Sequence, residues 1–297
     1  MRRLAAIDWG TSSLRGALLD GAGTVLEEKA VADGGILNIP QGGFPAFFES
    51  HFGAWMQPGT LCLIAGMAGS QQGWKEAPYC ACPAGFDEVA AKLAWIEPGR
   101  IAIVPGLSCE REGTPDVMRG EETQVLGAMG LFGARDGLFV LPGTHSKWVT
   151  VAGGRLESFA TFMTGEFYSL LRRHSILSRT LPPDEGEFDA EAFDRGLAHA
   201  ARAGSLLTTA FSVRTLSLFE RMPLAARPSY LSGLVIGEEL RCQPLAGVAS
   251  VTAIGSEALT QRYERALASR GIAVRRDGSQ ATWHGLAALA RQLEIPA

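Results

Sequence analysis

A strand, a Gly-Thr turn and a hairpin occur in the same order twice in this chain, and this repeat constrains the fold most. In the first copy an apolar run ends at Asp8, the turn Gly10-Thr11-Ser12-Ser13 follows, and strands are expected over residues 14–19 and 24–31. Gly10 can adopt a positive φ, and successive backbone N–H groups in such a turn form a concave site for an anion. Asp8 lies at the strand end, where a carboxylate can hold Mg²⁺ directly or through water. For this copy alone, an ordinary polar hairpin tip is the alternative.

The second copy shifts the balance toward phosphate binding. Residues 138–141 are apolar, the turn Gly143-Thr144-His145 follows, and strands are expected over residues 148–151 and 156–160. Two copies of one supersecondary unit are an internal repeat. Two such loops that face each other across a cleft can clamp the phosphates of one nucleotide.

This arrangement resembles the actin–sugar kinase–chaperone ATPase superfamily. The resemblance implies an α/β chain with a two-domain actin-like ATPase (ribonuclease H-like) fold and a nucleotide cleft between the domains. Strands that alternate with helices along the chain favour the same α/β layers. We place an N-terminal domain at residues 1–134 and a C-terminal domain at residues 135–297, with the last helix, over residues 281–293, near the hinge.

Composition excludes several other classes of protein. The chain has 297 residues, of which 46% are hydrophobic, and this suffices for two packed domains. Its formal net charge of −4 argues against nucleic acid as a partner. Since no apolar run reaches about 18 residues and the chain enters a strand at once, we expect no membrane span, no signal peptide and a cytoplasmic location. Reduced thiols are expected at the five unevenly spaced cysteines, which are Cys62, Cys80, Cys82, Cys109 and Cys242.

A loop with the character of a binding site follows the short strand expected over residues 61–65. It combines small and hydrogen-bonding residues, Gly69 and Ser70, with the aromatic Trp74 and the cationic Lys75. A solvated connection is the alternative. A helix is expected directly after this region, over residues 86–95.

Two acidic residues, Glu121 and Glu122, open a predicted helix that lies between the two Gly-Thr loops in the sequence. Acidic residues in a first turn are favoured by the helix dipole, and that alone could explain them. In sugar kinases of this superfamily, however, a carboxylate at such a helix start takes the proton from the hydroxyl that attacks the γ-phosphate. We expect one of the pair to be this base, with Glu121 the first choice and Asp8 as the third catalytic group.

The second half adds candidate nucleotide contacts. Thr164 has the character of a helix N-cap, and one helix is expected over residues 206–221. Gly233 lies in a small, apolar helix segment that could pass close under a nucleotide base, although tight helix packing explains it equally well. Gly255 and Ser256 follow a strand and open a helix, which resembles the superfamily's adenosine loop.

The longer motifs allow a closer comparison. The chain is similar to the 2-dehydro-3-deoxygalactonokinase family over residues 4–293. The motifs that carry the similarity are Asp8-Trp9-Gly10-Thr11, Ala65-Gly66-Met67-Ala68-Gly69-Ser70 with Gly73-Trp74-Lys75, Met118-Arg119-Gly120-Glu121-Glu122-Thr123-Gln124, Pro142-Gly143-Thr144-His145-Ser146-Lys147-Trp148 and Met163-Thr164-Gly165-Glu166. The family implies ATP-dependent phosphorylation of the 6-hydroxyl of 2-dehydro-3-deoxy-D-galactonate in galactonate breakdown, with ATP and Mg²⁺ as cofactors. It implies ATP contacts at Gly10, Thr11, Ser12, Arg15, Gly143, Thr144, His145, Lys147, Gly233, Gly255 and Ser256. It implies substrate contacts at Gly69, Ser70, Trp74, Lys75, Arg119, Gly165 and Glu166.

Two alternatives stay open at this point. A kinase for another sugar or keto-deoxy sugar acid, such as 2-dehydro-3-deoxygluconate, is the nearer one. A non-enzymatic ATP-gated binding protein is the more distant one, and a homodimer is also left open. Because a keto acid carries a fixed negative charge, Ser70 is expected to contact it with neighbouring amides, followed by Arg119, whose alternative role is an ion pair with Glu121 or Glu122.

Overall fold

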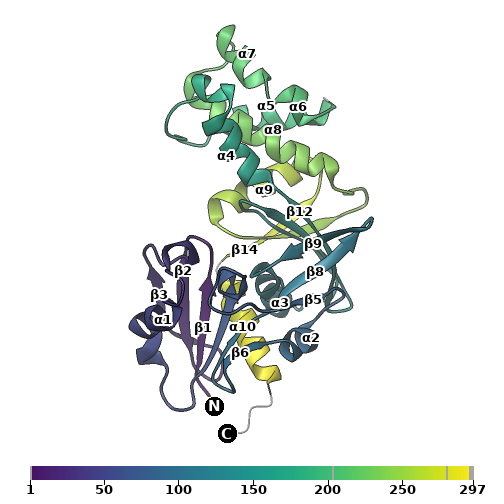
Figure 1. Ribbon diagram of the computed structural model, residues 1–297. Coiled ribbons are helices and arrows are strands. Elements are labelled where there is room, and N and C mark those ends of the chain that lie inside the picture. Colours follow the sequence, from purple (N-terminus) through teal and green to yellow (C-terminus); the bar gives the residue numbers. More distant parts are fainter. Residues whose placement is uncertain (1, 203, 279, 294–297) are drawn as a thin grey trace. The chain divides into compact units, whose positions relative to one another are not determined.

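The computed structural model describes residues 2–202, 204–278 and 280–293, and the chain divides into two compact units (Figure 1). Unit 1 comprises Met1–Phe139, Trp148–Ala160 and Asp277–Ala297, and unit 2 comprises Val140–Lys147 and Thr161–Arg276. Each unit is therefore built from segments that are distant in the sequence. The domain boundary expected between residues 134 and 135 stays a prediction.

The first repeat lies in a six-stranded sheet of unit 1, with the strand order β3-β2-β1-β4-β7-β6. Its strands are β1 (Leu4–Trp9), β2 (Leu14–Leu19), β3 (Val25–Val31), β4 (Leu61–Gly66), β6 (Ala94–Glu97) and β7 (Ile101–Ile103). Strand β1 runs antiparallel to β2 and parallel to β4, and the register places Asp8 opposite Arg15 on one side and Ala65 on the other. The carboxyl ends of β1 and β4 therefore meet at one edge of the sheet, where α/β proteins bind their ligands.

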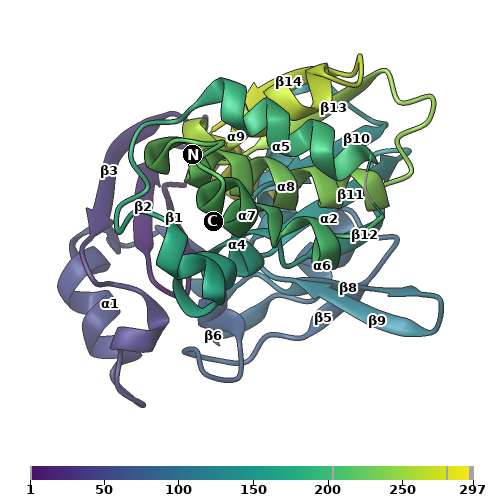
Figure 2. The ribbon, with the colours of Figure 1, turned by 90° about the horizontal axis from the view of Figure 1, so that it is seen from above.

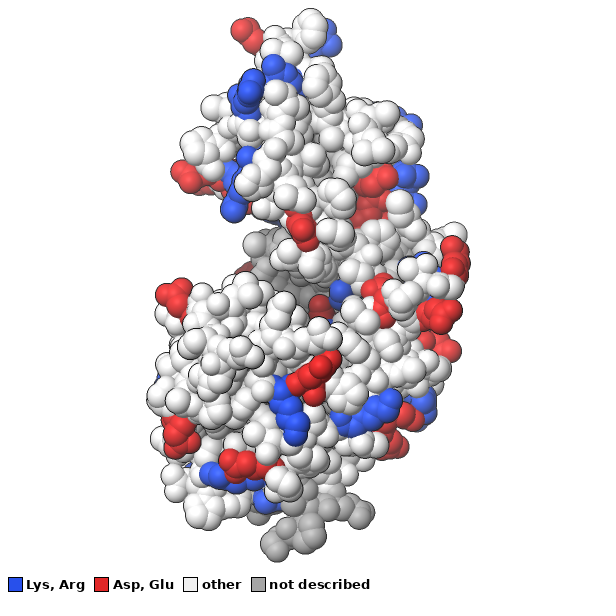
Figure 3. All heavy atoms as spheres, viewed as in Figure 1, with Lys and Arg blue, Asp and Glu red and all other residues white. Residues whose placement is uncertain are grey.

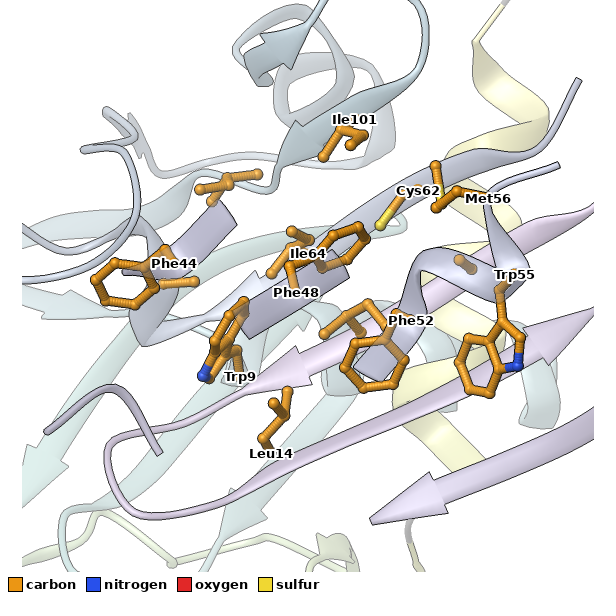
Figure 4. Close-up of a cluster of buried hydrophobic side chains, with 14 of the residues drawn as sticks. Trp9, Leu14, Phe44, Phe48, Phe52, Trp55, Met56, Cys62, Ile64 and Ile101 are labelled. Atoms are coloured by element: carbon orange, nitrogen blue, oxygen red, sulfur yellow. The ribbon is translucent and has the colours of Figure 1, made fainter. Parts of the chain in front are cut away.

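An aromatic core holds this sheet against helix α1 (Phe44–Phe52), which is followed by η2 (Gly53–Trp55). Phe44, Phe48 and Phe52 recur every four residues, so they share one helix face, and all three are buried. Figure 4 shows them beside Trp9 and Trp55 over the strands. The indole N–H of Trp9 donates to the carbonyl of Gly34 at 2.8 Å. The residue that follows Asp8 is thus fixed by packing and by a hydrogen bond.

Helix α10 (Gln280–Gln292), near the end of the chain, packs on α3 (Glu121–Phe132) and against strands β1 and β4 of unit 1. Two glycines allow the helices to approach closely. A Cβ on Gly127 would overlap the carbonyl oxygen of Ala281, and one on Gly285 would overlap that of Thr123. The acidic helix start of α3 is therefore supported by a distant segment of the chain.

Unit 1 also contains a three-stranded sheet that was not predicted from the sequence. Its last strand leads into helix α3. The sheet has the order β5-β8-β9 and consists of β5 (Tyr79–Ala81), β8 (Gly106–Arg111) and β9 (Thr114–Met118). Glu112 and Gly113, with φ of 51° and 75°, form the two-residue turn between β8 and β9. The helix expected over residues 86–95 is too long, because α2 (Phe86–Ala91) ends early and the residues after it pair with β7 as strand β6.

The second repeat contributes to a five-stranded sheet with the order β12-β11-β10-β13-β14. Its strands are β10 (Gly137–Leu141), β11 (Ser146–Ala152), β12 (Arg155–Phe162), β13 (Ser250–Ile254) and β14 (Ala273–Asp277). The helices of unit 2 are α4 (Thr164–His174), α5 (Ala190–Arg202), α6 (Leu206–Thr209), α7 (Ser212–Leu218), α8 (Arg227–Cys242) and α9 (Glu257–Ala268). The helix expected over residues 206–221 is therefore wrong, since it is broken into α6 and α7. The remaining short 3-10 helices of the two units are η1 (Ile36–Asn38), η3 (Met67–Gly69), η4 (Ile176–Thr180) and η5 (Leu224–Ala226).

Helices α5 and α8 run side by side and form much of the core of unit 2 (Figure 2). On the face drawn in Figure 3, acidic and basic side chains are interspersed rather than gathered in one basic field. None of the helices in the described part of the chain is long and apolar enough to cross a membrane.

Candidate active site

The first Gly-Thr loop is held in place by η1. Gly10 N–H donates to the carbonyl of Ser13 at 2.8 Å, and the carbonyls of Gly10 and Thr11 accept from Ile36 and Leu37 at 3.1 and 3.3 Å. The side chains of Thr11, Ser12 and Ser13 remain exposed. The loop therefore has a fixed backbone and free hydroxyls, as a phosphate site requires.

Asp8 is paired with Arg15, the residue opposite it on β2. Arg15 Nε and Nη2 lie 2.9 and 2.7 Å from Oδ2 of Asp8. Arg15 is itself fixed by α10, because its Nη2 donates to Thr282 Oγ1 at 3.0 Å and its guanidinium lies 5.1 Å from the ring of Trp283. Arg15 thus orients the Asp8 carboxylate and engages one of its two oxygens.

Two glycines bring the start of α3 next to Asp8. Gly66, at the end of β4, has φ of 92°, and a Cβ there would lie 2.7 Å from the carbonyl oxygen of Trp9 and 3.5 Å from Oδ1 of Asp8. Gly120, with φ of 106°, precedes α3, and its Cβ would lie 3.2 Å from Cα of Gly66. Side chains are disfavoured at both positions, so the backbones meet directly. An acidic strand end and an acidic helix start are thereby brought together.

Glu121 and Glu122 have different surroundings at this helix start. Glu122 is completely buried, and its carboxylate accepts from Gly120 N–H at 2.7 Å and from the Thr123 hydroxyl at 3.0 Å. Burial, followed by the charge of Glu121, raises the pKa of Glu122 to about 8. Glu121 is half-buried, and its Oε2 accepts from Arg119 N–H at 3.0 Å. Of the two, only Glu121 is accessible to a ligand.

The loop after β4 lies against Arg119. A Cβ on Gly69 would be 2.7 Å from Arg119 Nη1, so this glycine leaves room for the guanidinium. Ser70 follows directly, with a buried hydroxyl. Lys75 does not join them, because its ammonium donates to the carbonyl of Trp95 at 2.6 Å.

Trp74 packs against the aromatic core of unit 1 and also lines a groove. Its ring lies 5.3 Å from that of Phe48 and 6.2 Å from that of Trp9. It also lines an open groove together with Gln41, Gln71 and Gln72. An aromatic ring beside three amides suits a ligand with hydroxyl groups.

The second Gly-Thr loop is tied to the start of α4 within unit 2. His145 Nε2 lies 2.6 Å from Glu166 Oε2, and Glu166 N–H donates to the carbonyl of Thr144 at 3.0 Å. A Cβ on Gly165 would overlap the carbonyl oxygen of Gly143. Glu166 and Gly165, which the sequence analysis assigned to the substrate, are thus placed beside the loop. Lys147, at the end of the loop, is buried.

A buried carboxylate that the sequence analysis missed anchors the same loop. Glu239, on α8, accepts hydrogen bonds from the hydroxyls of Ser146 at 2.9 Å, Tyr263 at 2.7 Å and Thr164. Thr164 is therefore the first residue of α4 rather than its N-cap, and its hydroxyl is directed to Glu239. The only signal in the sequence was a glutamate within an otherwise apolar helix face.

A pocket in unit 2 adjoins this loop and is the candidate site for a nucleotide base. Its lining residues come from the loop and from α4, α8 and α9, and are Pro142, Gly143, Thr164, Gly165, Tyr168, Ser232, Val235, Ile236, Leu259, Arg262 and Tyr263. Gly255, with φ of 155°, is close to Pro142, and Ser256 precedes α9. Gly233 faces away, since a Cβ there would overlap the carbonyl oxygen of Phe193 on α5. The absence of a side chain at Gly233 allows α5 to pack closely on α8.

The donor set near Asp8 fits a hard divalent cation that is completed by phosphate and water. Within the described residues, no group of three or more His, Cys, Asp or Glu side chains could hold a metal ion by itself. Mg²⁺ keeps several waters and commonly uses one or two carboxylates together with substrate phosphates. Asp8 beside the first loop is suited to such a site.

Comparison with known proteins accords with this geometry. Residues 8–289 match the family model for 2-keto-3-deoxy-galactonokinase. A Rhizobium meliloti (strain 1021) protein named as a probable 2-dehydro-3-deoxygalactonokinase, DgoK1, is 41% identical over 97% of both chains. The 2-dehydro-3-deoxygalactonokinase of Escherichia coli (strain K12) is 34% identical over 92% of this chain and 91% of its own.

Solved structures give the same result. A Sinorhizobium meliloti crystal structure described as a 2-dehydro-3-deoxygalactonokinase superposes with a TM-score of 0.90 at 39% identity, covering 99% of this chain and all of the other. The activator of 2-hydroxyisocaproyl-CoA dehydratase from Clostridium difficile, solved with bound ADPNP, has a TM-score of 0.51 at 11% identity and covers 99% of both chains. The second similarity concerns the fold alone, the predicted actin-like ATPase fold. By sequence and by structure, this chain belongs to the 2-keto-3-deoxy-galactonokinase family.

Proposed function

We propose that this protein is an ATP-dependent kinase that phosphorylates the 6-hydroxyl of 2-dehydro-3-deoxy-D-galactonate in galactonate breakdown. The observation that carries the proposal is the meeting of Asp8, Gly66 and Gly120, which puts a strand-end carboxylate beside an acidic helix start. A phosphoryl transferase needs both a site for the metal that accompanies ATP and a base for the attacking hydroxyl. The names of the two relatives supply the substrate.

Asp8 is the proposed Mg²⁺ contact, either directly or through water. Arg15 occupies Oδ2, which leaves Oδ1, near Gly66, to face the ion. When bound, the ion would neutralise charge on the phosphates and orient them. The chain itself contributes the oriented carboxylate and, in the loop that begins at Gly10, the backbone N–H groups and hydroxyls of Thr11 and Ser12.

Glu121 is the proposed general base. It is the accessible member of the pair, whereas Glu122 is enclosed and bonded to Gly120 and Thr123. Burial favours the protonated, neutral form of Glu122. The charge of Glu121 would then not be repelled by a second negative charge next to it. Glu122 would then act on the base rather than on the substrate.

ATP is the proposed phosphoryl donor. The loops at Gly10 and Gly143 offer backbone N–H groups to phosphate, together with Thr144, His145 and Lys147. The nucleotide base of ATP is assigned to the unit 2 pocket near Gly255 and Ser256. The lining of this pocket includes apolar side chains and a few polar groups.

A cytoplasmic location is part of the proposal, and the thiols agree with it. All five cysteines are free, and burial raises the pKa of Cys62, Cys80, Cys82 and Cys109, which keeps these thiols protonated. A homodimer, which the sequence leaves open, is tested by sedimentation equilibrium.

Activity is tested by incubating the purified protein with ATP, Mg²⁺ and 2-dehydro-3-deoxygalactonate, and by following ADP and the sugar phosphate separately. We expect stoichiometric ADP and a product phosphorylated at C6, assigned by phosphorus–proton correlation NMR. Parallel reactions use 2-dehydro-3-deoxygluconate and galactose. Free phosphate without a phosphorylated product would instead indicate an ATP-gated binding protein, and preference for a neutral sugar would exclude the proposed substrate.

The base assignment is tested with Glu121→Gln and Glu122→Gln. Loss of a general base costs roughly 10²–10⁴-fold in kcat, so Glu121→Gln should show that loss and Glu122→Gln a smaller one. Single-turnover rates distinguish the chemical step from product release. A larger loss in Glu122→Gln would transfer the role to Glu122, and near-wild-type rates in both would exclude the pair.

A further inference from the structure

Arg119 carries a half-buried positive charge, and two of its nitrogens have no hydrogen-bond partner. Its Nη2 donates to the carbonyl of Ala77 at 2.8 Å, and its guanidinium lies 4.4 Å from the ring centre of Tyr79. Nε and Nη1 are both buried and have no hydrogen-bond partner. A guanidinium stays charged at any physiological pH, and leaving buried N–H groups of a charged side chain unpaired is costly. Such a group is suited to an anionic ligand.

A second unpartnered group belongs to the loop that contacts this guanidinium. The hydroxyl of Ser70 is buried and has no hydrogen-bond partner, and Ser70 follows Gly69, whose missing side chain leaves room for Nη1. Six buried side-chain atoms lack a partner among the described residues, and three of them belong to Arg119 and Ser70. Native structures leave few buried polar atoms unpaired, and a cluster of them calls for a ligand.

The hydrogen bonds of the two neighbouring acids involve backbone N–H groups and a hydroxyl. Glu121 accepts from the backbone N–H of Arg119, and the carboxylate of Glu122 is bonded to Gly120 and Thr123. The contacts of the guanidinium are a neutral carbonyl and an aromatic ring, neither of which removes its charge. The ion pair with Glu121 or Glu122, given above as the alternative role of Arg119, stays a prediction.

We propose that Arg119 and Ser70 bind the C1 carboxylate of the substrate, which makes them the residues that select a sugar acid over a neutral sugar. The inference rests on the proposed function in that the acid is the one this kinase phosphorylates. Arg119 donates from Nε and Nη1, and Ser70 donates from its hydroxyl. The ring of Tyr79 is assigned the role of positioning the guanidinium. Lys75 is left out of this proposal, since its ammonium donates to the carbonyl of Trp95.

The experiment compares acid and neutral ligands in Arg119→Met, Arg119→Lys and Ser70→Ala. Binding of 2-dehydro-3-deoxygalactonate and of its C1 amide is measured by calorimetry without ATP, and KM for the acid and for ATP is measured in the coupled assay. Arg119→Met should raise Kd and KM for the acid by roughly 10- to 100-fold, the effect of losing hydrogen bonds to a charged group. Kd for the amide and KM for ATP should change little, and Arg119→Lys should recover part of the loss.

Controls separate recognition from folding. Arg111→Met removes an exposed arginine from the tip of the β8–β9 hairpin, outside the proposed site, and should behave as wild type. Tyr79→Phe should keep the acid affinity because it retains the ring, while Tyr79→Leu should lose part of it. Thermal unfolding identifies any variant that fails to fold, and Ser70→Ala then carries the test.

The outcomes distinguish this inference from the proposed function. Wild-type turnover of the acid with an unchanged acid-to-amide preference in Arg119→Met and Ser70→Ala would overturn the carboxylate subsite and leave the kinase intact. Absence of turnover in the wild type would overturn the kinase proposal. In that case, calorimetric binding of the acid that depends on Arg119 would still support the subsite, and binding independent of Arg119 would overturn it as well.

Discussion

Among single residues, the acidic groups of unit 1 differ mainly in what surrounds them. Asp8 faces the guanidinium of Arg15, whereas the carboxylate of Glu122 accepts from Gly120 N–H and the Thr123 hydroxyl and is shut away from water. Burial favours the neutral form of Glu122. Two carboxylates of the same candidate site can therefore have separate tasks.

Replacing Asp8 by Asn keeps the size of the side chain but removes the charge proposed to face Mg²⁺. We expect kcat to fall by roughly 100-fold or more, the usual effect of removing one electrostatic contact to a reacting group. The measurement is kcat over a Mg²⁺ titration, with melting temperature as a check on the fold. Asp33→Asn is the matched control, because Asp33 is exposed and has φ of 53°, which asparagine tolerates. Wild-type kcat at saturating Mg²⁺ would disprove the assignment.

Glu122 should make the stability of the protein depend on pH. Its pKa is about 8 in the folded protein, against 4.5 for the free side chain. Between these values the folded state retains a proton that the unfolded state has lost, so the free energy of unfolding falls as the pH rises, and the loss is complete above about 8. Glu122→Gln cannot ionise, and its stability relative to wild type should therefore increase across this window.

Urea unfolding of Glu122→Gln and wild type across this pH range measures the difference. Glu157→Gln, an exposed change in the same unit, supplies the baseline. A pH-independent difference between Glu122→Gln and wild type would show that Glu122 does not titrate in the window.

At the scale of elements, the sequence predicted those whose signal is local. The strand before Asp8, its Gly-Thr turn and the helix at Glu121 were predicted because apolar periodicity and glycine position specify them. Strand β5 was missed because it has three residues and its partner β8 lies further along the chain, whereas β8 and β9 were missed although they pair with each other as a hairpin. The turn at Glu112-Gly113 was the one local signal for β8 and β9.

The candidate site, too, was only partly predictable from the sequence. Arg119 and Ser70 could be proposed from residue type, but their unpartnered donors depend on packing that no sequence pattern displays. The role of Lys75 could not be predicted, since it depends on where the chain returns at Trp95. Glu239 was missed because its three hydroxyl partners come from three other elements.

The network around Glu239 links the second Gly-Thr loop to α4, α8 and α9, so its loss should loosen the loop. Glu239→Gln replaces an acceptor with an amide that must donate on one side, and Ser146, Thr164 and Tyr263 would then lack a full set of acceptors. We expect kcat/KM for ATP to fall by up to roughly 100-fold, the effect of misplacing a binding group by about 1 Å. Affinity for the sugar acid should stay near wild type.

Steady-state kinetics with each substrate varied in turn provides the test, supported by melting temperatures. Glu238→Gln is the matched control, since Glu238 pairs with Arg241 on the surface of the same helix. Equal losses for ATP and the sugar acid would contradict a role confined to the loop.

At the scale of the whole molecule, unit 1 is completed by a helix from near the end of the chain. Helix α10 packs on α3 and supplies Thr282 and Trp283 to Arg15, the partner of Asp8. The contact between α10 and α3 depends on Gly127 and Gly285, whose missing side chains let the backbones meet. Both acidic groups of the proposed mechanism are therefore supported by the same distant helix.

Two glycine-to-alanine changes on α3 should have opposite effects. Gly127→Ala places a methyl group against the backbone of α10 and should destabilise the protein by roughly 1–3 kcal/mol and lower kcat. Gly130→Ala lies on the exposed side of α3, where a Cβ meets nothing, and should stabilise it by roughly 0.5–1 kcal/mol through helix propensity. Urea unfolding measures both, and destabilisation by both would show that α3 tolerates no added side chain on either face.

The place of α10 in the sequence has a consequence for biosynthesis. As the chain leaves the ribosome, α3 emerges long before the helix that must cover it, and until then Gly127 has no α10 to pack against. A nascent chain at this stage presents an apolar helix face to chaperones, and Arg15 lacks the two side chains that orient it toward Asp8. The proposed phosphoryl-transfer centre would thus be assembled only after α10 has been synthesised, so a nascent chain that still lacks α10 would have no working site with which to consume ATP.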